Sequence, residues 1–183
     1  TTARTNPGIE GLLWPNPHTL MPFTVIDHLG KPFGLEQMSG KWSLLFFGYT
    51  HCPDVCPITL TVLKDFYARL VKENTAADVQ IIFVTVDPAR DTQEQVANYV
   101  HYFNDKFIGL TGTEEQISAL AQQIGVLFYK ADTSENYAVD HSVAVFLISP
   151  DRKWVGIFSP PHKVEDLHAR FNAIIKFIKT TAN

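Results

Sequence analysis

Three apolar segments of strand length, separated by segments with helical periodicity, constrain the fold of this chain most strongly. The apolar segments are residues 42–48, 79–86 and 143–148. Their length and continuous hydrophobicity are typical of strands buried on both faces of a sheet. An amphipathic helical pattern covers about 54–73, and capping boxes at Thr92 and Thr113 begin two further helices. Strands joined through helices pair in parallel with right-handed crossovers.

The remaining segments complete one α/β domain, with a central mixed sheet flanked by helices. A turn leads from the third apolar segment into 154–158, so these two strands are expected to form an antiparallel hairpin. A last amphipathic helix covers about 163–179, and 23–33 predict a small hairpin near the start of the domain. Residues 1–22 contain four prolines and fit no helical or strand period. We therefore expect an irregular N-terminal arm, followed by a single domain over 23–180.

Charge and composition exclude several classes of protein. The net charge of −4, without a long run of Lys or Arg, argues against nucleic-acid binding. Two cysteines are too few for a disulfide-rich framework. The longest apolar runs, about seven residues, are far shorter than the roughly 20 residues that span a bilayer. The first residues contain no signal peptide or anchor, so we expect a mature or truncated form.

The chemistry of the sequence is concentrated in the segment Gly48–Pro57, which holds both cysteines, Cys52 and Cys56. The segment follows a buried strand and begins a helix, where Pro53 suits the first turn. A separation of four positions predicts that both sulfurs lie on one helical face. The positive helix start favours thiolates by only about 0.3–1 kcal/mol, whereas a bound metal deprotonates thiols outright.

Three interpretations of the two thiols remain open at this point. A redox dithiol is feasible, because four helical residues span about 6 Å, near the limit of about 6.8 Å for a disulfide. A metal site is equally consistent, since paired thiolates select copper(I), zinc or iron–sulfur clusters, although structural zinc requires four ligands. The third interpretation is a pair of buried structural cysteines.

A third metal ligand has to come from elsewhere in the chain, and His141 is the best candidate. It immediately precedes the third apolar strand, and ligands in such sheets gather in loops at one end. His51 is expected to point away from the thiols. Surface roles are expected for the other histidines, which are His18, His28, His101, His162 and His168.

Four sequence blocks in order resemble the Sco/SenC family of copper-binding proteins, and the arm segment Leu12–Pro17 resembles that of bacterial members. The blocks are Thr50–Pro57, Val86–Thr92, Leu110–Gly112 and Val139–Ser142. The resemblance runs from about Leu13 to the last helix, and it implies a thioredoxin-like fold, in agreement with the strand and helix order.

The resemblance implies a copper metallochaperone, which carries copper(I) or copper(II) and helps to assemble the dinuclear copper A centre of cytochrome c oxidase. Cys52, Cys56 and His141 match the copper ligands of the family. The implied partners are the oxidase subunit that carries this centre and other copper carriers, and the implied location is the bacterial periplasm, beside an N-terminal membrane anchor. The alternative is a thiol–disulfide oxidoreductase that reduces the cysteines of the oxidase copper site.

Two acidic residues are candidates for supporting the site. Asp87 follows the second buried strand, and either forms the turn into the next helix or supports the site through Arg90 or a thiol. Asp140 borders His141 and is expected to orient its loop. General oxidoreductases of the thioredoxin type carry a cis-proline before a late strand, where this chain has Asp140-His141-Ser142. This difference favours a metal-binding assembly factor over an enzyme.

Overall fold

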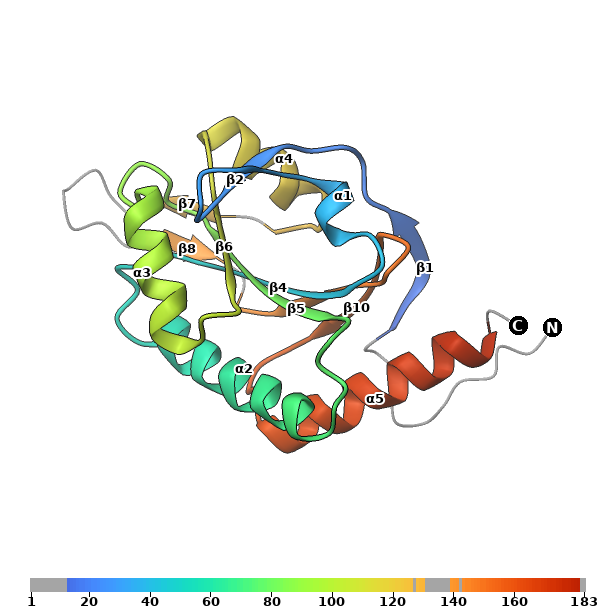
Figure 1. The fold of residues 1–183 in the computed structure, drawn as a ribbon. Helices are drawn as coiled ribbons and strands as arrows, with labels where there is room; N and C mark the ends of the chain where they lie inside the picture. Colours follow the sequence, from blue (N-terminus) through green and yellow to red (C-terminus); the bar gives the residue numbers. More distant parts are fainter. Residues whose placement is uncertain (1–12, 127, 131–138, 142, 182–183) are drawn as a thin grey trace.

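The computed structural model of the chain describes residues 13–126, 128–130, 139–141 and 143–181, and Figure 1 shows its fold. The strands are β1 (Leu13–Thr19), β2 (Val25–Asp27), β3 (Pro32–Phe33), β4 (Trp42–Gly48), β5 (Val79–Thr85), β6 (Ile108–Thr111), β7 (Phe128–Lys130), β8 (Val139–His141), β9 (Val145–Ile148) and β10 (Lys153–Phe158). The helices are α1 (Leu35–Met38), α2 (Val55–Lys72), α3 (Gln93–Phe103), α4 (Glu114–Gln123) and α5 (Val164–Thr181).

The three apolar segments form the centre of a mixed sheet, as the sequence predicts. Within the described residues, the sheet has eight strands in the order β1-β10-β9-β4-β5-β6-β2-β3. Strands β4, β5 and β6 are parallel, with Trp42 opposite Val79 and Gly48 opposite Thr85. Strand β9 runs antiparallel to β4 and forms the predicted hairpin with β10. One end of the sheet therefore holds the carboxyl ends of β4, β5 and β6 together with the start of β9.

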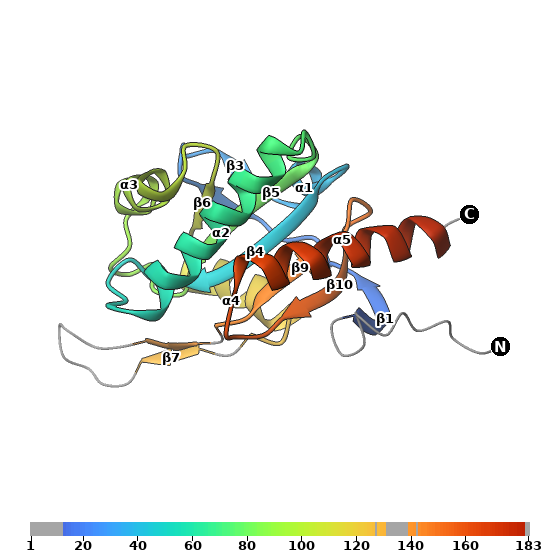
Figure 2. The same ribbon diagram turned by 90° about the horizontal axis from the view of Figure 1, so that it is seen from below.

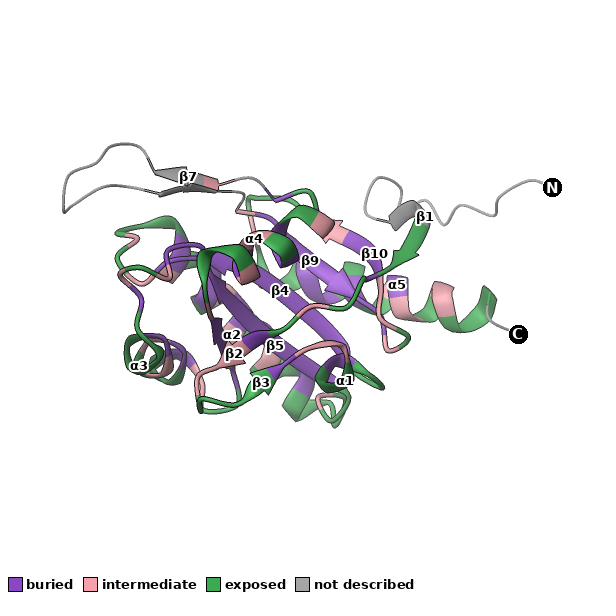
Figure 3. Cartoon of the chain, turned by 90° about the horizontal axis from the view of Figure 1, so that it is seen from above, coloured by how far each residue is buried: buried purple, intermediate pink, exposed green. Residues whose placement is uncertain are grey.

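Helices cover both faces of this sheet. Figures 1 and 2 show α2, α3 and α5 on one face, and Figure 3 shows α1 and α4 on the other. Successive side chains of a strand point to opposite faces. Accordingly, Phe46 packs in the core beneath α2 and α5 with Phe66, whereas Phe47 packs in the core beneath α4 with Leu120.

Local signals define the helix ends that frame the site. The predicted capping boxes are present: Gln95 N donates to Thr92 Oγ1 at 3.2 Å, and Gln116 N donates to Thr113 Oγ1 at 3.1 Å. Helix α4 ends before Gly125, whose φ of +69° is the left-handed conformation that glycine adopts without strain. In the described residues, no helix is long and apolar enough to cross a bilayer.

The irregular arm predicted over residues 1–22 is wrong for its second half, because Leu13–Thr19 form strand β1. The strand lies at the sheet edge, where proline is tolerated because one side of the backbone needs no ladder partner. Its register with β10 shifts between Leu13 and His18, and this bulge spans Pro15 and Pro17. The prolines that obscured the strand in the sequence are thus accommodated by its edge position and its bulge.

Strands β7 and β8 form a separate two-stranded antiparallel sheet, in which Phe128 pairs with His141 and Lys130 with Val139. The loop expected before the third apolar strand thus contains a short strand, β8. Figures 1 and 2 both show this ribbon at the end of the molecule where the chain enters α2.

Candidate functional site

The candidate site lies where β4, β5 and β6 end, at the edge that ligands favour in sheets of this kind. The chain leaves β4 at Gly48 and reaches α2 through residues 49–54, while residues 86–92 connect β5 to α3. The two connections start together, because Val86 N donates to Gly48 O at 2.8 Å.

The two cysteines occupy different kinds of structure. Cys56 lies in the first turn of α2 with none of its surface exposed, whereas Cys52 lies before the helix and is half-buried. The prediction that both sulfurs share one helical face is therefore wrong. Pro53 disfavours the helical conformation at Cys52, and the helix begins only at Val55.

Gly48 makes room for the sulfur of Cys56. A Cβ atom at Gly48 would lie 2.8 Å from Cys56 Sγ and 2.9 Å from Phe83 Cε2. Both distances are shorter than ordinary contacts, so the sulfur fills the space that a side chain would occupy. The glycine at the end of β4 thus fixes where the buried sulfur sits relative to the sheet.

The two thiols are close together without being bonded covalently. A hydrogen bond joins the Cys52 and Cys56 side chains, and no disulfide links them. This hydrogen bond, followed by burial, raises the pKa of the Cys56 thiol far above its ordinary value. The helix start therefore does not produce a thiolate at Cys56, and a bound cation is needed to displace its proton.

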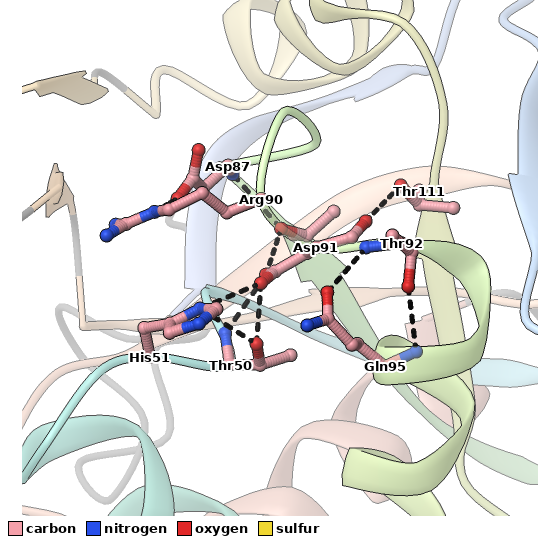
Figure 4. A network of polar contacts seen from close by, with 9 residues as sticks. Thr50, His51, Asp87, Arg90, Asp91, Thr92, Gln95 and Thr111 are labelled. Carbon is pink, nitrogen blue, oxygen red and sulfur yellow. Dashed lines mark hydrogen bonds and ion pairs between the residues drawn. The ribbon is translucent and has the colours of Figure 1, made fainter. Parts of the chain in front are cut away.

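Asp91 ties the cysteine loop to the sheet and was not singled out by the sequence. Its buried carboxylate accepts hydrogen bonds from Thr50 N at 3.0 Å, Thr50 Oγ1 at 2.6 Å and Thr85 Oγ1 at 2.6 Å (Figure 4). The hydroxyl of Thr111 also reaches the Asp91 carbonyl oxygen at 3.4 Å. The carboxylate thus connects the end of β5 with the residue two positions before Cys52, and the Asp91 carbonyl oxygen adds a contact to the end of β6. The only sequence signal was its place in the Val86–Thr92 block.

Asp87 supports the same loop by a second route. Its carboxylate is fully buried and pairs with Arg90 Nε. The Arg90 guanidinium in turn lies over the ring of Tyr49, 5.7 Å from its centroid. Asp87 is thus linked to the residue that directly follows Gly48.

The histidines are placed partly as expected. The His51 ring turns towards Asp91, with Nδ1 3.5 Å from Oδ1, and 48% of its side chain is exposed. His168 was expected on the surface, but it is 9% exposed on α5, with Nε2 2.7 Å from Glu73 Oε2. The expectation fails because the start of α5 packs closely against the end of α2.

His141 and Asp140 lie in β8, and their side chains lie outside the described residues. The backbone register puts His141 opposite Phe128, in the ribbon at the same end of the molecule as the cysteine loop. Among the side chains that the structure describes, no three His, Cys, Asp or Glu converge as a metal cluster. Among the proposed metal ligands, the structure therefore describes the side chains of Cys52 and Cys56.

Comparisons with known proteins show what this chain is similar to. The family model described as SCO1/SenC matches residues 14–176. The protein "SCO1 homolog 1, mitochondrial" of Arabidopsis thaliana is 41% identical over 147 residues, which is 80% of this chain but 44% of that protein. This chain therefore spans less than half the length of that relative.

Two solved structures of copper-bound proteins share the fold. Arabidopsis thaliana ScoI with copper bound has a TM-score of 0.79 and 38% identity, covering 89% of this chain and 99% of that structure. Bradyrhizobium japonicum ScoI with copper bound has a TM-score of 0.76 and 32% identity, covering 85% and 99%. These matches confirm the thioredoxin-like fold, and the second is a bacterial protein.

Proposed function

Because the chain belongs to the SCO1/SenC family, we propose that it binds one copper ion through Cys52, Cys56 and His141. Two thiolates and one imidazole satisfy copper(I) in a three-coordinate arrangement, and copper(II) accepts the same donors with one further weak ligand. The copper ion is cargo in this proposal, and the protein hands it to the copper A site of cytochrome c oxidase.

The contact between the two thiols carries the proposal. Cys56 is held in a buried helical turn, Cys52 lies in the loop before it, and a hydrogen bond joins their side chains. Two soft donors that are already adjacent need little rearrangement to hold one soft cation. The position of β8 at the same end of the molecule supports His141 as the third donor.

Release of the ion follows from the same arrangement. A three-coordinate site leaves a position open, through which a thiolate of the oxidase subunit, or of another copper carrier, enters and displaces these ligands one at a time. Cys52 is half-buried whereas Cys56 is fully buried, so exchange begins at Cys52. The proposed location is the periplasmic side of the bacterial inner membrane, where family members are held by an N-terminal anchor.

We propose supporting roles for the two acidic residues. Asp87 holds Arg90 over Tyr49 and so steadies the start of the cysteine loop. Asp140 orients the strand that carries His141. Removing either carboxylate is expected to weaken copper binding less than removing a ligand does.

A second candidate function is reduction of the cysteines of the oxidase copper site. The adjacent thiols favour it, because they can transfer two electrons to a partner disulfide and become a disulfide themselves. Copper and the disulfide use the same sulfurs, so the two functions exclude each other at any moment.

Copper titration tests the proposal. Copper(II) is expected to bind at one equivalent with a thiolate-to-copper charge-transfer band, and His141→Ala is expected to weaken binding and change the band. His101→Ala, which removes an exposed imidazole from α3, serves as the matched control. Full affinity and an unchanged band in His141→Ala would exclude His141 as a ligand. No copper binding, together with rapid exchange with a peptide that carries the target cysteine pair, would favour the oxidoreductase.

A further inference from the structure

Tyr99 of α3 carries a buried hydroxyl that has no hydrogen-bond partner among the residues that the structure describes. Its ring is fixed by packing, with centroids 5.3 Å from Phe83 and 5.4 Å from Phe103. A buried donor without a partner loses its hydration and gains nothing in return. Such a group requires an explanation, and the surroundings of Tyr99 provide one.

The hydroxyl lies in the neighbourhood of the cysteine sulfurs. Phe83 packs against Tyr99 on one side and approaches Gly48 on the other, where Cys56 Sγ lies within 2.8 Å of the same Cβ position. Burial, followed by the negative charges of Cys56, Cys52 and Asp91, raises the pKa of Tyr99. The phenol therefore stays protonated, and both sulfurs are near enough for their charge to act on it, Cys56 more strongly than Cys52.

We infer that the Tyr99 hydroxyl donates a hydrogen bond to the Cys56 sulfur when copper is bound, and that this bond favours copper(I) over copper(II). The inference rests on the proposed function. In the metal-free protein the Cys56 and Cys52 side chains are hydrogen-bonded to each other. Metal binding releases thiol protons to solvent and leaves negative sulfur in the neighbourhood of a buried donor that has no acceptor among the described residues.

The preference for copper(I) follows from the electron density on sulfur. A hydrogen bond draws density away from a thiolate and makes it a weaker donor to the metal. The more highly charged copper(II) depends more on that donation than copper(I) does. The hydroxyl would thus act on the metal through the ligand, by the same means that tunes other copper–thiolate sites.

Tyr99→Phe tests the inference, because it removes only the hydroxyl and keeps the packed ring. The affinities for copper(I) and copper(II) are measured separately with competing chelators, along with the charge-transfer band and the urea midpoint of the copper-free protein. The control is Tyr102→Phe, which removes a hydroxyl from the same helix, on a side chain that is 84% exposed.

The expected result is that the ratio of copper(I) to copper(II) affinity falls by about tenfold in Tyr99→Phe, from the strength of a hydrogen bond to a charged group. The charge-transfer band is expected at longer wavelength, and the copper-free midpoint at the parent value or higher. Tyr102→Phe is expected to leave all three readouts unchanged.

Three results would overturn the inference. If the parent binds copper and Tyr99→Phe leaves the affinity ratio and the band unchanged, this inference fails and the proposed function stands. A lower copper-free midpoint with an unchanged ratio assigns the hydroxyl a structural role. If the parent binds no copper, the proposed function fails, and the inference that rests on it fails too.

Discussion

Replacing Asp91 by asparagine tests how strongly the cysteine loop is tied to the sheet. The buried carboxylate accepts three hydrogen bonds, two from Thr50 and one from Thr85, and it lies near the His51 ring. An asparagine side chain has nearly the same shape, but only one of its two terminal atoms accepts hydrogen bonds. Its NH₂ group must then face a group that donates to the native carboxylate.

The expected loss of stability follows from these contacts. A hydrogen bond to a charged group contributes about 1.5–3 kcal/mol, against about 1 kcal/mol for a neutral pair. The Asp91→Asn amide can keep all three contacts, because the Thr50 hydroxyl can accept a hydrogen bond from the NH₂ group. Each contact then becomes a neutral pair in place of a charged one, so the free energy of unfolding should fall by about 3 kcal/mol. For a domain of this size, about 2–4 °C per kcal/mol gives a decrease in Tm of about 6–12 °C.

Urea unfolding of the copper-free protein, followed by circular dichroism, measures this loss. Asp105→Asn is the matched control, because Asp105 is exposed and its substitution should change stability by less than about 0.5 kcal/mol. Thr50→Val removes one hydroxyl that donates to the carboxylate and should cost about 1.5–3 kcal/mol. The loss in the double variant should be smaller than the sum of the two single losses. If Asp91→Asn unfolds at the parental urea concentration, the carboxylate does not hold the loop.

Three further substitutions test separate parts of the structure. Gly48→Ala places a Cβ within 2.8 Å of Cys56 Sγ, so stability should fall by about 1–3 kcal/mol and copper affinity with it; parental thermal unfolding and chelator competition would contradict the close approach. Burial, followed by the charge of His101, lowers the pKa of His28 from 6.5. His28 is thus harder to protonate in the folded than in the unfolded protein. The free energy of unfolding should therefore fall as the pH drops below about 6.5. Between pH 7.5 and 5.5, the urea midpoint of His101→Gln should fall less steeply than that of the parent protein. An equal slope would refute the effect of His101 on the His28 pKa. Thr113→Ala removes the cap of α4 and should cost about 1 kcal/mol in thermal unfolding, whereas no loss would show that the cap is dispensable.

The central sheet was predictable because its signals are local. Segments 42–48 and 79–86 are apolar except for Ser43, Gln80 and Thr85. They form strands β4 and β5, which are buried along their full length. The capping box at Thr92 and the glycine at 125 marked helix ends by short-range chemistry that tertiary contacts did not override. Strand β1 was missed because its prolines conceal any alternation, and its existence depends on a partner, β10, that follows it by more than 100 positions.

The support of the candidate site was predictable only in part. The cysteine pair and Asp87 stand out because cysteines are rare here and the aspartate directly follows a buried strand. Asp91 does not stand out, since its partner Thr50 is 41 positions away and a hydrogen bond between distant side chains leaves no periodic pattern. The unpartnered hydroxyl of Tyr99 is likewise visible only in three dimensions, because a tyrosine on an amphipathic helix resembles any core aromatic.

The parts of the proposed site differ in how firmly the fold holds them, and this difference bears on copper transfer. Cys56 is fixed by α2 and by the space above Gly48, and Cys52 is positioned through Thr50 and Asp91. His141 belongs to β8, which pairs with β7 and not with the eight-stranded sheet in the described part of the chain. The sulfurs are thus adjacent before any metal arrives, whereas the imidazole comes from a separate ribbon. Such a site can capture copper on two preplaced thiols, and it can exchange its third ligand without disturbing the core that holds them.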